Sequence, residues 1–171
     1  MNHVKVGIVI GSDSDLKVMK GAADMLEYFG IGYEIVISSA HRVPDRTIQY
    51  AKSAEERGLE VVIAGAGMAA HLPGVIAACT SLPVIGVPIQ SGPLEGKDAL
   101  LSMVQMPSGV PVAVMAINGA KNAGIFAAQI LSGKDPEIRR KLKEYKERLA
   151  EEVNAKAEKL KRLGIEGYLS E

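Results

Sequence analysis

The sequence predicts an α/β protein: a three-layer α/β/α sandwich built on a parallel sheet, with a long C-terminal helix. Short apolar runs of strand length alternate with segments of helical period from residue 4 to residue 131. Such alternation is typical of βαβ units. The first run, Val6 to Ile10, is apolar throughout. A continuous apolar run favours a strand that is covered by helices on both faces.

Each predicted strand is followed by a predicted helix. The strands are expected at residues 4–10, 33–37, 60–64, 83–87 and 110–116, and the helices at 16–29, 46–56, 72–78, 98–105 and 120–131. We find no repeat, low-complexity tract or linker, and 171 residues are too few for two ordinary domains. The chain 1–171 is therefore expected to be a single domain with a core over about 4–132.

The last part of the chain differs in pattern. Apolar residues recur there every three or four positions between Lys, Arg and Glu: Ile138, Leu142, Tyr145, Leu149, Val153, Ala157, Leu160 and Leu163. This spacing predicts one amphipathic helix over about 135–163. Packing on its own core is the default expectation. A helix of this length extends beyond a sheet of ordinary strands, so contact of its distal half with another subunit is the alternative.

Composition restricts the class of partner. Lys+Arg 20 balances Asp+Glu 20, so no basic field attracts nucleic acid and a small-molecule partner is expected. The single cysteine, Cys79, cannot form an intramolecular disulfide, and its presence alone is consistent with a reducing compartment. We expect its side chain to be buried and to fill space in the core. The sequence shows neither a secretory signal nor an apolar run of the roughly 20 residues that span a bilayer. We expect a cytoplasmic protein that does not bind membranes.

The most informative stretch runs from Ser38 to Asp45, directly after the second predicted strand. It contains His41 beside Arg42. A histidine can give and take a proton near neutral pH, and the planar fork of an arginine suits a phosphate or carboxylate. Pro44 followed by Asp45 resembles a helix start, whose N–H groups also favour an anion. The alternative is a helix-entry loop with a solvated His-Arg pair.

The loop after the first strand, residues 11–15, offers small residues, hydroxyls and a helix N-terminus. Ligands of open α/β sheets bind at the carboxyl ends of the strands, so this loop is a candidate for phosphate or ribose recognition. The alternative is that Ser14 or Asp15 only caps the following helix. A magnesium site formed by Asp13 and Asp15 is a weaker alternative.

The loop after the third strand, residues 65–74, is rich in glycine, which lets backbone approach a ligand closely. It matches G-x-G-x-x-A, but in the third βα unit and with no acidic residue about 20 positions on, so we set nicotinamide binding aside. His71 in this loop is a candidate functional residue, and the alternative is that its role is purely structural. If the first three strands lie in the order 2-1-3, the three loops converge on one pocket.

Five separated motifs carry a family resemblance: Gly11-Ser12-x-Ser14-Asp15, Ser39-Ala40-His41-Arg42-x-Pro44, Ala69-Ala70-His71-Leu72-Pro73-Gly74, Gly86-Val87-Pro88 and Val104-Gln105-Met106-Pro107-x-Gly109-Val110-Pro111-Val112. In this order they resemble the N5-carboxyaminoimidazole ribonucleotide mutase family of purine biosynthesis, from about Val6 to Leu131. The resemblance implies a flavodoxin-like fold and a homo-octamer with active sites shared between subunits. It also implies transfer of a carboxylate from the exocyclic amine to C4 of the imidazole, without ATP, metal, biotin or other cofactor.

Applied to these loops, the resemblance implies two catalytic histidines, His41 as the proton shuttle and His71 as a residue that closes the pocket or orients a polar group. The implied substrate-binding residues are Gly11, Ser12, Ser14, Asp15, Ser39, Ala40, Arg42, Ala66, Gly67 and Leu72. Ser12, Ser14 and Arg42 are expected to hold the phosphate or the migrating carboxylate. Asp15 is expected to accept hydrogen bonds from the ribose hydroxyls, and Ser39 to position the heterocycle.

Three residues depart from the family pattern: Met68 stands where Gly is usual, Val43 where Thr is usual and Lys97 where an apolar residue is usual. If position 68 needs a positive φ, Met68 is strained and its side chain narrows the pocket. Two other functions stay open: a carboxylase that uses carbon dioxide directly and a non-catalytic nucleotide-binding module. The animal carboxylases of this family have Lys in place of Arg42 and lack the Ala-Ala-His-Leu-Pro-Gly segment, so this chain is similar to the mutase branch.

Overall fold

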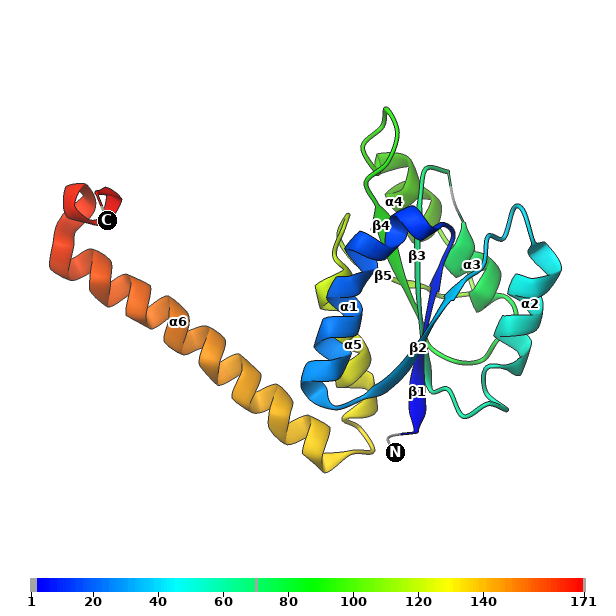
Figure 1. Ribbon diagram of the computed structural model, residues 1–171, viewed down its shortest axis with the longest axis horizontal. Coiled ribbons are helices and arrows are strands. Elements are labelled where there is room, and N and C mark those ends of the chain that lie inside the picture. Colours follow the sequence, from blue (N-terminus) through cyan, green and yellow to red (C-terminus); the bar gives the residue numbers. More distant parts are fainter. Residues whose placement is uncertain (1–2, 70, 171) are drawn as a thin grey trace.

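The computed structural model describes residues 3–69 and 71–170, so Ala70 of the third-loop motif lies outside the described residues. At its centre is a parallel sheet of five strands in the order β2-β1-β3-β4-β5 (Figure 1). The strands are β1 (Val4–Ile10), β2 (Gly32–Ile37), β3 (Val61–Gly67), β4 (Val84–Ile89) and β5 (Ala113–Val114). This strand order is that of the flavodoxin-like fold, which confirms the predicted α/β class.

Helices cover both faces of the sheet (Figure 1). One face packs against α1 (Leu16–Phe29), α5 (Ala120–Leu131) and the first turns of α6 (Pro136–Leu169). The other face packs against α2 (Pro44–Ser53), α3 (Leu72–Ala77) and α4 (Lys97–Val104). The predicted three-layer sandwich is therefore confirmed.

The apolar run of β1 divides its side chains between the two faces of the sheet. Val6, Ile8 and Ile10 belong to the cluster under α1 and α5. Val9 belongs to the cluster under α2 and α3, because successive side chains of a strand point to opposite faces. Both clusters are buried, so residues 6–10 of β1 have no solvent-facing side that would need polar residues.

Strand β1 and helices α1 and α5 have their predicted bounds, whereas the other elements differ at one or both ends, α2 and β5 among them. Helix α2 begins at Pro44, earlier than the predicted 46, because proline fits the first turn of a helix, where no N–H donor is needed. Strand β5 was predicted over 110–116 but pairs with β4 only through Ala113 and Val114. As an edge strand it has one partner, and Pro111 just before it has no N–H to donate.

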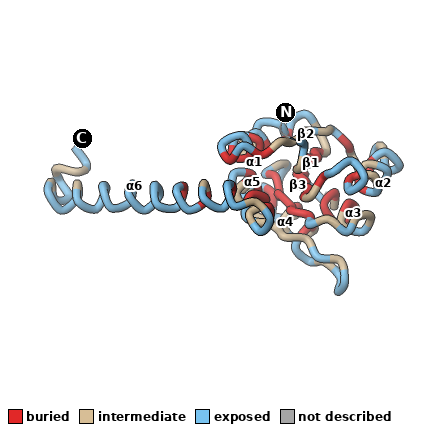
Figure 2. Tube along the Cα trace, turned by 90° about the horizontal axis from the view of Figure 1, so that it is seen from below, coloured by how far each residue is buried: buried red, intermediate tan, exposed pale blue. Residues whose placement is uncertain are grey.

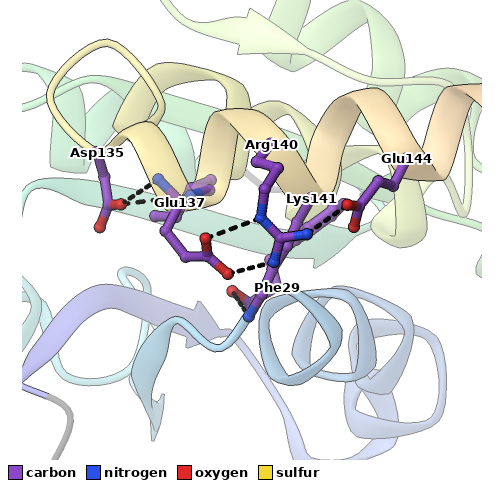
Figure 3. Close-up of polar contacts among 7 residues, drawn as sticks. Phe29, Asp135, Glu137, Arg140, Lys141 and Glu144 are labelled. Atoms are coloured by element: carbon purple, nitrogen blue, oxygen red, sulfur yellow. Dashed lines mark hydrogen bonds and ion pairs between the residues drawn. The ribbon is translucent and has the colours of Figure 1, made fainter.

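Helix α6 contacts the domain through its N-terminal part, up to Arg148, whose guanidinium lies 5.1 Å from the centroid of the Tyr28 ring on α1. The Asp135 carboxylate accepts hydrogen bonds from the N–H groups of Glu137 (3.0 Å) and Ile138 (3.3 Å), and Lys141 Nζ donates to Phe29 O (3.1 Å) (Figure 3). Beneath these contacts the apolar residues of α6 are buried: Ile138, Leu142 and Tyr145. The cap and the apolar contacts together fix the direction in which the helix leaves the sheet.

The distal part of the helix projects away from the domain (Figures 1 and 2). Leu149, Val153 and Leu160 are 41%, 64% and 45% exposed. The default expectation that the helix packs on its own core is therefore wrong for the distal part, because 34 residues at about 1.5 Å each extend well past the sheet. The predicted end at Leu163 coincides with a break, since Gly164 has φ of 64° inside the helical segment.

Two smaller expectations can also be compared with the structure. Cys79 packs at the edge of the cluster under α2 and α3 and is only partly buried, so the prediction of a buried filler is too strong. Within residues 3–69 and 71–170, no helix has the length and hydropathy required to cross a membrane.

Candidate active site

The loops after β1, β2 and β3 line one open cavity of about 560 Å³. Strands β2, β1 and β3 are neighbours in that order, so their carboxyl ends lie at the same edge of the sheet. The cavity is lined by Gly11, Ser12, Ser14, Asp15, Ser39, His41, Arg42, Ala66, Gly67, Met68, Ala69 and Ser91. The convergence predicted for the 2-1-3 order is therefore found, and most of the predicted site residues share this cavity.

The first loop is a capped turn with a buried carboxylate. Ser12 Oγ accepts a hydrogen bond from Ser14 N (3.4 Å), and Asp15 Oδ2 accepts one from Ser12 N (3.1 Å). Asp15 is 7% exposed, and this burial raises the pKa of its carboxyl group, against the backbone hydrogen bond from Ser12, which lowers it. The cap of this turn is Ser12, with Asp15 as its capping-box partner, and Asp15 makes no side-chain cap bond to α1. The alternative that Ser14 or Asp15 only caps the following helix is therefore wrong, and Ser12, Ser14 and Asp15 all line the cavity.

The second loop holds its arginine against the first loop. Arg42 Nη2 donates to Gly11 O (3.0 Å), and Arg42 N donates to Ser39 Oγ (3.3 Å). Beneath the loop the hydroxyls of Ser38 and Thr47 form a buried hydrogen bond of 2.8 Å. His41 is exposed on the cavity wall beside this fixed cation. The arrangement places an imidazole and a guanidinium at one cavity, as proton transfer and anion binding would require.

The third loop contributes backbone groups to the cavity wall and one residue with a strained backbone conformation. Met68 has φ of 58° and is 56% exposed in the cavity wall. The condition set by the sequence analysis is therefore met, because a left-handed conformation is unfavourable for a residue with a Cβ. Gly67 allows close approach of the next loop, since a Cβ there would lie 2.8 Å from Ser91 Cβ.

Three predicted site residues, His71, Ala40 and Leu72, do not line this cavity. His71 Nδ1 lies 2.7 Å from Ser102 O on α4, and its ring covers Gly74, where a Cβ would be 2.1 Å from Nε2. Ala40 packs on the core beneath the second loop, and Leu72 is 2% exposed. The catalytic role of His71 stays a prediction; in the single chain its ring is held at Ser102 O and does not line the cavity.

Sequence reasoning did not include Ser91 among the site residues. Ser91 follows Gln90 directly after β4, and it lines the cavity. The rule that ligands bind at the carboxyl ends of parallel strands could have found it, because β4 is the neighbour of β3.

The carboxylates that were considered for magnesium are engaged within their own loop. Asp13 Oδ1 accepts hydrogen bonds from Ser12 Oγ (3.0 Å) and Ser14 N (3.0 Å), and Asp15 accepts from Ser12 N. In the part of the chain that the structure describes, no three His, Cys, Asp or Glu side chains are grouped as metal ligands would be.

Comparison with known proteins gives consistent matches over nearly the full chain. A family model described as AIR carboxylase matches residues 5–152. An N5-carboxyaminoimidazole ribonucleotide mutase from Thermotoga maritima is 64% identical over 167 residues, 98% of each chain. The protein of the same name from Pyrococcus horikoshii is 61% identical over 166 residues, 97% of this chain and 94% of that one. The crystal structure of Treponema denticola PurE superposes with a TM-score of 0.83 at 34% identity, covering 91% of this chain and 98% of that chain.

Proposed function

The chain belongs to the AIR carboxylase family, and on that premise we propose that it is an N5-carboxyaminoimidazole ribonucleotide mutase, an intramolecular transferase. It converts N5-carboxyaminoimidazole ribonucleotide to 4-carboxy-5-aminoimidazole ribonucleotide in de novo purine (IMP) biosynthesis. The names of the two mutase relatives support the proposal. The structural observation that carries it is the convergence of His41 and Arg42 on one cavity with the serines and carboxylate of the first loop.

The reaction moves one carboxyl group within the molecule. The bond from the exocyclic nitrogen to the carboxyl carbon breaks, which releases carbon dioxide and leaves aminoimidazole ribonucleotide. C4 then attacks the carbon dioxide and forms the new carbon–carbon bond. The nitrogen gains a proton and C4 loses one, so the isomerisation needs no net proton, and His41 carries this proton between the two atoms.

The remaining residues bind and position the substrate. Arg42, Ser12 and Ser14 hold the phosphate or the migrating carboxylate, and Asp15 accepts hydrogen bonds from the ribose hydroxyls. Ser39 and the backbone at Ala66 and Gly67 position the heterocycle, while Gly11, Ala40 and Leu72 shape the loops around it. Retention of carbon dioxide close to C4 is mainly a proximity effect, so a loosened pocket releases it and accumulates aminoimidazole ribonucleotide.

The proposal also covers the assembly and the location of the enzyme. The whole chain, 1–171, acts as one catalytic domain without cofactor, in the cytoplasm. It forms a homo-octamer in which active sites are shared between subunits. The exposed apolar residues of the distal α6 support self-association. His71 does not line the cavity of the single chain, so the role proposed for it needs a neighbouring subunit to complete the site.

The decisive experiment measures 4-carboxyaminoimidazole ribonucleotide formed from freshly prepared N5-carboxyaminoimidazole ribonucleotide, in degassed buffer without ATP or bicarbonate. Product above an enzyme-free control is expected. Its absence would remove the mutase assignment and leave the family membership.

A direct carboxylase is the second candidate, and the name of the matching family favours it. Aminoimidazole ribonucleotide with added bicarbonate is the substrate pair that tests it. Product from this pair alone would identify a carboxylase, and binding of the nucleotide without any product would identify a non-catalytic module. The presence of both His41 and Arg42 in the cavity speaks against the module.

A further inference from the structure

A second cavity of about 440 Å³ adjoins the proposed active site and contains two arginines, Arg42 and Arg46. It shares Ser12, Ser39 and Arg42 with the larger cavity. Arg46 belongs to α2, lines only this second space and was not among the predicted site residues. A ligand with an anionic end could therefore occupy both spaces at once, with Arg42 at their common border.

Both guanidinium groups are anchored at the carboxyl ends of adjacent strands. Arg42 Nη2 donates to Gly11 O (3.0 Å), just after β1, and Arg46 Nη2 donates to Ile37 O (2.6 Å), the last residue of β2. The two strands are paired at this level, with Ile10 opposite Ile37. A guanidinium has five N–H donors, so each arginine keeps donors for a ligand after this bond. The anchoring reduces the side-chain freedom that ligand binding would otherwise remove.

The other polar groups around this cavity favour an anion on balance. Ser39 Oγ accepts from Arg42 N, and its hydroxyl proton can still donate to a ligand. Helix α2 begins here at Pro44, and its N-cap Val43 provides no side-chain cap, which adds the positive end of a helix to the two cations. Asp13 is a carboxylate in the lining whose negative charge opposes anion binding. Its Oδ1 already accepts hydrogen bonds from Ser12 and Ser14.

We infer that Arg46 binds the phosphate of the ribonucleotide together with Arg42, so that the phosphate occupies the second cavity and the ribose and imidazole occupy the larger one. The inference rests on the proposed function for the identity of the nucleotide. Two fixed guanidinium forks match the double charge of a phosphomonoester better than the single charge of a carboxylate. The role left open for Arg42 is thereby assigned to the phosphate. Arg46 is a binding residue that does not line the larger cavity with His41, so it acts on affinity and not on the chemical step.

The test compares Arg46→Gln with Lys52→Gln, which removes the same charge from the far end of the same helix. Two stable probes, 5-aminoimidazole-4-carboxamide ribonucleotide and its nucleoside, differ only in the phosphate. For Arg46→Gln we expect about tenfold weaker binding of the ribonucleotide by calorimetry, unchanged binding of the nucleoside, and a KM about tenfold higher at similar kcat. Lys52→Gln should match the wild type, and Arg46→Lys should lose less affinity than Arg46→Gln because it keeps the charge.

The outcomes separate this inference from the proposed function. If the wild type lacks mutase activity while Arg46→Gln still loses affinity for the ribonucleotide alone, the proposed function fails and the phosphate site stands. If the wild type is an active mutase and Arg46→Gln keeps both its KM and its ribonucleotide affinity, the phosphate site is wrong. Equal losses for ribonucleotide and nucleoside would also overturn it, since they would indicate a general disturbance of the loop. Melting temperatures of all variants check that they are folded.

Discussion

His41 is the side chain on which the proposed chemistry depends most directly. Replacement by Asn keeps the size and polarity of the side chain but removes the group that transfers the proton. We expect kcat to fall by about 10²-fold or more, with binding of 5-aminoimidazole-4-carboxamide ribonucleotide changed little, because general acid–base groups act in the transition state. Steady-state kinetics and calorimetry measure the two quantities. His3→Asn, at an exposed position outside the cavity, is the matched control. Near-normal turnover in His41→Asn would exclude the assignment.

Met68 offers a test of backbone strain at the cavity. Its φ of 58° places it in the left-handed region, which costs a residue with a Cβ about 1–2 kcal/mol. Met68→Gly relieves this strain but makes the unfolded chain more flexible, so we expect a net gain of about 0.5–1 kcal/mol in unfolding free energy. Denaturant titration measures it. Met68→Ala keeps the Cβ and should show no such gain in unfolding free energy. An equal gain in both variants would mean that removal of the exposed thioether, and not relief of the positive φ, stabilises the protein.

Asp15 should make stability depend on pH in a defined direction. Burial raises the pKa of its carboxyl above the ordinary 3.8, so the folded state favours the neutral form. The stability from this preference is fully present below pH 3.8 and is lost as pH rises through the pKa of the folded state. Asp15→Asn, neutral at every pH, should therefore melt above the wild type at pH 7, and the difference should shrink as pH falls. A difference that does not change with pH would refute this account.

At the residue scale, more of the cavity-lining residues could be predicted from the chemistry of their side chains than from their expected positions in the fold. His41 and Arg42 could be chosen because proton transfer and anion binding need those side chains, and both line the cavity. The environment of His71 could not be predicted, since its partner Ser102 is 31 residues away in sequence. Arg46 was overlooked because its bond to Ile37 O depends on how α2 lies over β2.

At the scale of elements, local patterns located the buried helices and strands but not all of their ends. The bounds of α1 and α5 were predictable because their apolar faces repeat over several turns. Strand β5 was overestimated, since an apolar run states only that a segment can be buried, and pairing at the sheet edge decides how much of it is a strand. The exposed distal part of α6 has the same apolar spacing as its buried part, so periodicity could not tell which partner covers it.

The packing of α1 on α5 depends on one glycine. A Cβ at Gly124 would lie 2.6 Å from Ala22 O and 2.9 Å from Met25 Cβ. Gly124→Ala should lower the unfolding free energy by about 1–3 kcal/mol, because overpacking outweighs the better helix propensity of alanine. Gly21→Ala is the matched control on the facing helix, where the nearest atom to the new Cβ is at 3.4 Å, and it should be neutral or stabilising. Thermal and denaturant unfolding compare the two; similar effects would show that the close approach is not limiting.

At the scale of the whole molecule, the proposed active site depends on a strand order that no local pattern contains. The loops of β1, β2 and β3 meet because β1 lies between the other two strands. That order is set by contacts between segments far apart in sequence, so sequence analysis could state it only as a condition. The cavity, the anchoring of Arg42 on Gly11 and the approach of Ser91 to Gly67 all follow from it.

The distal α6 should hold subunits together, because its apolar stripe continues beyond the last residue that the domain buries. Val153 and Leu160 are 64% and 45% exposed and lie on the same helical face as the buried Leu142. Val153→Glu combined with Leu160→Glu should dissociate the proposed octamer while the domain stays folded, since neither residue is part of the buried core. Light scattering after size exclusion measures the mass, and circular dichroism checks the fold.

The control for that variant changes the net charge equally on another face of the same helix, through Lys143→Gln combined with Lys161→Gln. This pair should leave the mass unchanged, because neither side chain is on the apolar stripe. If active sites are shared between subunits, the dissociated variant loses turnover although His41 and Arg42 remain in place. Full turnover in a dissociated monomer would show that one chain suffices for catalysis. An undissociated Val153→Glu, Leu160→Glu protein would show that the stripe is not the contact, and the assembly would then depend on other exposed apolar residues such as Leu101 on α4, which is 59% exposed.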